Sequence, residues 1–94
     1  MFVITLRFAD KARAPQFMDA HKAWIGRGFD DGVFLLAGSL QPNAGGTILA
    51  HNASPEAIAA RVQDDLFVAE GVVSAEILAV TPGRTDDRLA FLKA

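Results

Sequence analysis

The chain of 94 residues contains no cysteine, and this absence removes several kinds of chemistry at once. Without a thiol there is no disulfide, no cysteine nucleophile and no thiolate ligand for a metal ion. The two histidines, His21 and His51, lie far apart in the sequence and share no metal-binding motif. No glycine-rich segment leads into a helix as a phosphate-binding loop does. The sequence therefore predicts neither a metal ion nor another cofactor.

Positive charge and long apolar runs are also scarce. Nine lysines and arginines are scattered among eleven acidic residues, which gives a net charge of −2 and no basic face for nucleic acid. No segment approaches the roughly 18 apolar residues of a membrane span, so we expect no membrane partner. The first residues, 1–7, lack the basic region and cleavage site of a signal peptide. We therefore expect a cytoplasmic protein.

Hydrophobic residues, in contrast, make up 51% of the sequence. The length fits one domain, and we expect residues 1–94 to form it, with a core over about 2–82 and a tail over 83–94. A domain of this size has a large surface for its volume, so an apolar excess indicates a surface that meets a partner. The simplest partner is a second copy of the chain, and we expect a homodimer.

The apolar pattern predicts secondary structure in the order β-α-β-β-α-β. Strands are expected over 2–9, 33–40, 47–50 and 72–80, with a helix over 12–29 and a helical segment over 54–71. The continuous apolar run at 33–40 indicates a buried strand, and the tail predicts a short helix over 85–92. The order matches the ferredoxin-like α+β fold, an antiparallel sheet with two helices on one face. The other face is then the natural surface for dimer contact.

The segment FMDAHKAW at 17–24 places a histidine on an apolar helix face. At helical spacing Phe17, His21 and Trp24 share one side. An imidazole buried without a hydrogen-bond partner costs about 1–3 kcal/mol, whereas a carboxylate partner removes that cost and favours the imidazolium. At the edge of a cavity such a histidine acts as a general acid or base. The alternative is a half-buried histidine whose role is structural.

The carboxylate partner has several candidates. Asp65, in the segment QDDLF, follows Val62 by three residues and can share the apolar face of the second helix. Aspartate is rarely buried without a partner, so one of Asp64 and Asp65 faces solvent and the other can face inward. Alternatively, both are solvated at a frayed helix end. Asp30 and Asp31, where the first helix ends, are rivals for contact with His21.

Four segments together resemble one known family. They are the histidine at 20–21 on a helix, the strand GVFLLAGSL at 32–40, the glycine-containing hairpin at 45–49 and the segment DLFVAEG at 65–71. Over residues 2 to about 82 the chain resembles the YciI-like (YCII-related) family of small dimeric α+β-barrel proteins. Leu66 stands where that family has proline, and the tail from Thr85 exceeds the usual core.

The resemblance implies a ferredoxin-like fold that dimerises through its sheets as a dimeric α/β barrel. It also implies an active site in which His21 pairs with Asp65. Ser39 follows the glycine of the second strand and would line the same cleft. Members of this family look like small enzymes, and related dimeric barrels process small cyclic or aromatic compounds. The implied activity is an analogy of fold, which does not fix function.

Three functions follow as hypotheses. In the first, an enzyme, Asp65 orients His21, which moves a proton in hydrolase-like or lyase-like chemistry on a small, largely apolar or aromatic substrate. Phe17, Trp24 and Phe67 would form apolar parts of the binding site. In the second, a non-catalytic small-molecule-binding or accessory protein, the same pair only orients a ligand. The third is a structural module for oligomer assembly.

Overall fold

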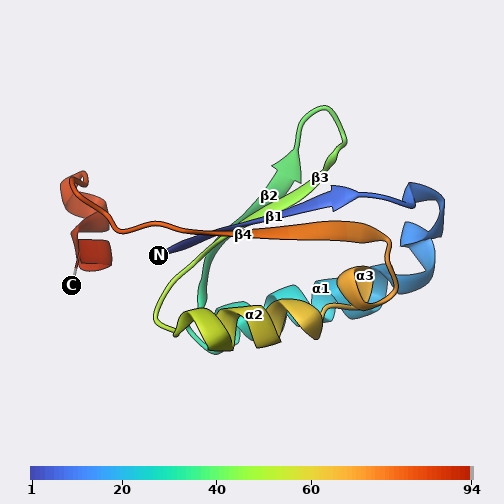
Figure 1. Ribbon diagram of the computed structural model, residues 1–94, viewed down its shortest axis with the longest axis horizontal. Helices are drawn as coiled ribbons and strands as arrows, with labels where there is room; N and C mark the ends of the chain where they lie inside the picture. The colour runs from blue at the N-terminus through green and yellow to red at the C-terminus, as the bar shows by residue number, and fades with distance from the viewer. Residues whose placement is uncertain (94) are drawn as a thin grey trace.

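The fold is a four-stranded antiparallel sheet with helices on one face (Figure 1). The computed structural model describes residues 1–93. The strands are β1 (Phe2–Phe8), β2 (Phe34–Leu40), β3 (Gly45–Ala50) and β4 (Val73–Ala79). The helices are α1 (Ala14–Asp30), α2 (Pro55–Gln63) and α3 (Leu66–Ala69), with short 3-10 helices η1 (Lys11–Arg13) and η2 (Asp87–Lys93). The strand order β2-β3-β1-β4 confirms the predicted ferredoxin-like α+β fold.

The core lies between the sheet and the helices, because successive side chains of a strand point to opposite faces. Ile4 and Leu6 of β1 are buried on the helix side. The antiparallel register places Ile4 between Ile48 of β3 and Ile77 of β4. Trp24 enters this core from the helix layer, on α1, and is its largest side chain. The alternation of apolar residues in β1 therefore predicted correctly which of its side chains pack against the helices.

The opposite face of the sheet carries a line of apolar side chains that the helices do not cover. The register aligns Leu78, Val3, Leu49 and Leu36 across all four strands. We call these four residues the apolar row. Its two ends, Leu36 and Leu78, are 49% and 47% exposed. An apolar line of this kind on an uncovered sheet face is a surface suited to contact with another protein.

The predicted burial of the second strand is wrong for the chain alone. Phe34 is the only buried residue within β2, and residues 36–39 are exposed. The reason is the position of β2 at the edge of the sheet, where β3 is its single neighbour. A continuous apolar run indicates burial on both faces, but it does not say whether the burying surface belongs to the same chain.

Helix α1 begins and packs as its residue types require. Pro15 lies in its first turn, where a backbone N–H has no partner within the helix, so the N–H that proline lacks is not needed. Gly28 is buried directly against the Phe34 ring, and a β-carbon at this position would clash with that ring. Trp24 packs edge-to-face on Phe34 and donates its Nε1 hydrogen to the Arg61 carbonyl over 2.8 Å, which ties α1 to α2.

The second helical segment is interrupted rather than continuous. Ser54 caps α2 as predicted, with its hydroxyl accepting the Ala57 N–H over 3.1 Å. The helix then ends at Gln63, because Asp65 adopts an extended backbone (φ −69°, ψ 124°) and starts α3 as a new N-cap. Gly71, with φ +70°, follows α3, in agreement with the predicted stop. The break turns the Asp65 side chain into the molecule.

The C-terminal η2 lies apart from the sheet and helices, at the far end of an extended segment (Figure 1). Leu89 and Phe91 on it are 46% and 49% exposed. The Phe91 ring touches the His51 ring edge-on, with centroids 5.5 Å apart. A short helix is therefore present in the tail as predicted, in 3-10 form. Within residues 1–93, no helix has the length and apolar character needed to cross a membrane.

Candidate functional site

The centre of the candidate site is a contact between α1 and the break that separates α2 from α3. His21 Nδ1 lies 2.9 Å from Asp65 Oδ1. The Asp65 side chain is completely buried, whereas the His21 side chain is 13% exposed. A carboxylate only accepts hydrogen bonds, so Nδ1 carries the hydrogen of this contact. The ring nitrogen that remains, Nε2, is then the one available to a ligand when the imidazole is neutral.

The two oxygens of Asp65 differ in their surroundings. Oδ1 accepts both the His21 Nδ1–H and the Phe67 N–H, the latter over 3.1 Å. Oδ2 is buried and has no hydrogen-bond partner among residues 1–93. An unsatisfied buried acceptor costs about 1–3 kcal/mol. A buried polar atom without a partner is uncommon in folded proteins and calls for an explanation, of which a catalytic role is one.

Aromatic neighbours hold the plane of the His21 ring. The Phe67 ring stacks on it almost in parallel, with centroids 4.0 Å apart and planes 6° apart. The Trp24 ring is the second neighbour, with its centroid 5.9 Å from that of the imidazole and an angle of 26° between the two planes. Between these contacts and the bond to Asp65, the imidazole has little freedom to rotate. Nε2 makes no hydrogen bond within the described residues and is not among their sealed polar atoms.

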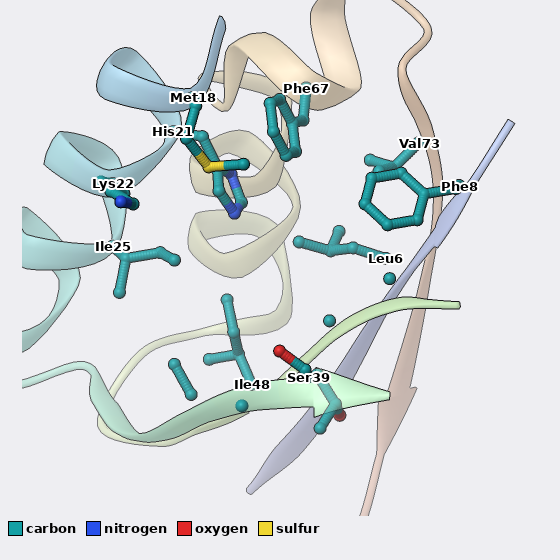
Figure 2. Close-up of a pocket in the computed structure, with 15 residues that line it drawn as sticks. Leu6, Phe8, Met18, His21, Lys22, Ile25, Ser39, Ile48, Phe67 and Val73 are labelled. Carbon is teal, nitrogen blue, oxygen red and sulfur yellow. The ribbon is translucent and has the colours of Figure 1, made fainter. Parts of the chain in front are cut away.

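A cavity of about 290 Å³ opens beside this ring, between α1, α3 and the helix side of the sheet. Figure 2 shows His21 reaching into it from α1 and Ser39 from β2, with the hydroxyl directed toward the histidine. Its lining is mainly apolar: Leu6, Phe8, Met18, Ile25, Ala37, Ile48, Phe67 and Val73. The volume is at the small end of ligand pockets, which run from roughly 300 to 1,000 Å³. A ligand of about one aromatic ring suits this space.

The predicted site residues separate into two groups. His21, Ser39 and Phe67 line the cavity, and Asp65 lies directly behind the imidazole. Trp24 does not line it, because its ring is buried under Phe34 and its Nε1 faces α2.

Phe17 does not line the cavity either. It is half-buried against the core, and the Arg13 guanidinium lies 5.5 Å from its ring centroid. The prediction that Phe17 and Trp24 form apolar parts of the binding site is therefore corrected. They lie on the core stripe of α1, and only His21 extends from that stripe into the cavity.

The cavity stripe of α1 was missed, although the sequence carries a signal for it. Met18, Lys22 and Ile25 line the cavity together with His21. Their spacing of three and four residues defines a face rotated by roughly 100° from the stripe that begins at Phe17. His21 belongs to the edge of both faces. A search for two overlapping stripes, rather than one, would have found these residues.

The rival carboxylates lie elsewhere. Asp31 accepts a hydrogen bond from Arg61 over 2.8 Å, and Asp64 is exposed beside Asp65. Asp30 is exposed in the last turn of α1. His51 lies near η2, away from the cavity. Across residues 1–93 there is no cluster of three or more metal-ligating side chains.

Comparison with known proteins identifies the fold but no family. No family model matches the chain, and no curated protein does. Among solved structures, it is similar to a 5-chloro-2-hydroxyhydroquinone dehydrochlorinase from Burkholderia phenoliruptrix AC1100 in complex with 2,5-dihydroxybenzoquinone. The TM-score is 0.70 at 14% sequence identity, over 88% of this chain and 96% of that chain. At this identity the likeness establishes a common fold.

Proposed function

We propose that the protein is a small-molecule enzyme in which His21 moves a proton at Nε2 while Asp65 holds the ring. One observation carries the proposal: the 2.9 Å contact of Nδ1 with a fully buried carboxylate, on a ring that borders an apolar cavity. This is the arrangement in which a histidine serves as general base and then as general acid.

The role of each group follows from its contacts. Asp65 accepts the Nδ1 hydrogen and so fixes the tautomer whose Nε2 lone pair is available to a substrate. When Nε2 takes a proton, the carboxylate stabilises the imidazolium that forms. Phe67, stacked on the ring, keeps it in the orientation required for transfer. The Ser39 hydroxyl, on the other side of the cavity, can donate a hydrogen bond to a substrate oxygen.

A lyase-like elimination on a small aromatic compound is the reaction type we favour. Nε2 removes a proton from the substrate, the electron pair of that bond moves into the ring system, and a leaving group departs with its own bonding pair. The similar solved structure is named as a dehydrochlorinase of a chlorinated hydroquinone, which supports this choice at the level of fold analogy. Hydrolysis would use the same lone pair to activate water, and the products distinguish the two reactions.

We also propose that residues 1–94 are a single domain of the YciI-like family that acts as a homodimer. The segment at 65–71 that carries the resemblance forms the capped turn beside the cavity, which is consistent with a shared site. The apolar row supports a dimer formed through sheet faces, because it leaves large apolar side chains such as Leu36 and Leu78 in contact with solvent.

The enzyme proposal is tested with chlorinated hydroquinones as substrates and chloride release as the readout. The wild-type protein is expected to release chloride, and His21→Gln to lower the rate by about 10²- to 10⁴-fold, as expected for loss of a general base. His51→Gln, at the histidine outside the cavity, is the matched control and should retain the rate. Equal rates for wild type and His21→Gln would contradict the proposal. Binding without turnover would favour the non-catalytic binding protein.

A further inference from the structure

The cavity contains a single charged side chain of fixed sign, and it is a cation. Among the residues that line it, Lys22 is the lysine, and no aspartate or glutamate reaches the lining. The carboxylate that contacts His21, that of Asp65, is sealed behind the ring with no exposed atom. The Lys22 ammonium is therefore the one charge of fixed sign that a ligand in the cavity can contact directly.

Lys22 has no counter-ion of its own. No ion pair or hydrogen bond within residues 1–93 involves its side chain, whereas Arg13, Arg61 and Arg88 each pair with a carboxylate. The residue is exposed on α1 immediately after His21. Figure 2 shows it on the α1 side of the cavity, next to Ile25. A lysine in this position can lay its apolar stem along the rim and direct its charge toward a bound molecule.

The rest of the lining favours an apolar ring. Met18, Ile48 and Phe67 supply apolar and aromatic contact on both the helix and the sheet sides. The polar side chains of the lining are His21, Ser39, Lys22 and Thr47, and the Thr47 hydroxyl already donates to the Ile4 carbonyl. A ligand seated against the apolar residues would point its polar substituents toward the other three. Of these, only Lys22 always carries a positive charge near neutral pH. The Lys22 ammonium and the apolar lining together favour a ligand that has a ring and an anionic oxygen.

We propose that the cavity takes a small aromatic anion, a ring that carries an ionised carboxylate or hydroxyl oxygen, and that Lys22 is the residue that selects the anion over its neutral analogue. The inference rests on the proposed function in that it assigns this cavity to the substrate. An ammonium beside a developing negative charge would also favour proton removal by His21, because it stabilises the electron pair left on the ring.

The test uses benzoate and its neutral isostere benzamide, titrated into 15N-labelled protein and followed by the amide signals of Met18, Ile48 and Phe67. Wild type is expected to bind benzoate about 1.5- to fivefold more tightly than benzamide, the range for an ion pair open to solvent. In Lys22→Gln the two affinities should become equal. Gln16→Glu lowers the charge of α1 by the same one unit at an exposed position away from the cavity, and should keep the preference.

The salt dependence of the benzoate preference provides a second test of the role of Lys22. The benzoate preference of wild type should decrease as ionic strength rises, and that of Lys22→Gln should not change. A preference that survives in Lys22→Gln would overturn the role of Lys22. Equal affinities in wild type, with shifts at the cavity residues, would overturn the anion inference and leave the proposed enzyme standing. An absence of shifts at these residues with both probes would overturn the inference and the proposed substrate site together.

Discussion

At the scale of single residues, Asp65 has two roles that meet on one oxygen atom. Oδ1 caps α3 through the Phe67 N–H and also accepts the His21 Nδ1–H. The sequence predicted a carboxylate partner for His21 and offered Asp65 among four candidates. It could not predict the cap, because the sequence pattern indicated one continuous helical segment through residue 65. In such a helix the carboxylate would lie along the helix face, whereas in the structure Asp65 is the N-cap of a new helix. The helix break that decides the site depends on one residue's backbone conformation.

Removal of the Asp65 side chain should therefore destabilise the fold through two losses. Asp65→Ala eliminates an N-cap and leaves the half-buried His21 without its partner, while it also removes the unpaired buried Oδ2. We expect the free energy of unfolding to fall by about 1–3 kcal/mol. Urea denaturation measures this change. Asp64→Ala, one residue earlier and exposed, is the control and should change the free energy by about 0.5 kcal/mol or less. Similar effects for the two variants would argue against the double role of Asp65.

The same contact predicts which nitrogen of His21 carries the hydrogen. In the neutral imidazole, Nδ1 is the donor to Asp65 Oδ1, so 15N shifts of the ring should report the Nδ1–H tautomer. Free neutral histidine in water prefers the other tautomer, Nε2–H. His51, half-buried and outside the cavity, serves as an internal reference. In Asp65→Leu, which offers no acceptor, His21 should move toward the pattern of His51. An unchanged His21 tautomer in that variant would show that Asp65 does not set it.

At the scale of elements, local chemistry could be read from the sequence where it depends on neighbouring residues. Ser54 before Pro55 marked the start of α2, and Pro15 marked the first turn of α1. Burial that depends on distant elements could not be read in this way. The apolar run of β2 is exposed because its strand lies at the sheet edge, and the cavity stripe of α1 is defined by the strands opposite it. Both require the tertiary arrangement.

The two glycines of α1 distinguish propensity from packing. A β-carbon at Gly26 meets nothing within 4 Å, so Gly26→Ala should stabilise the protein by up to about 1 kcal/mol through helix propensity. Gly28→Ala makes the same change two residues later, where the new methyl would clash with the Phe34 ring. We expect it to destabilise by about 1–3 kcal/mol. Thermal and urea unfolding of both variants measure the contrast, and stabilisation by Gly28→Ala would contradict the tight packing of α1 on β2.

At the scale of the whole molecule, the exposed apolar surface and the site are on opposite faces of one sheet. Ile4 and Ile48 point toward the helices and support the cavity side, while Val3 and Leu49, one residue away on the same strands, belong to the apolar row. Sheet contact between two copies would thus cover the row without closing the cavity from the helix side. The apolar excess of the sequence predicted such a surface, but only the strand register shows that its members form a continuous line.

The dimer proposed for this protein is tested at the two exposed ends of the apolar row. Leu36→Lys and Leu78→Lys each place a charge on the sheet face, and in a two-fold interface every substitution occurs twice. We expect either to raise the dimer dissociation constant by about tenfold or more, since buried unpaired charges are strongly unfavourable at an interface. Sedimentation equilibrium measures the constant. Leu66→Lys, at a leucine 38% exposed on the helix side, is the control and should leave the constant unchanged. A dimer would make the melting temperature of wild type rise with protein concentration, by mass action. If wild type sediments as a monomer and its melting temperature does not depend on concentration, the sheet-face dimer is wrong.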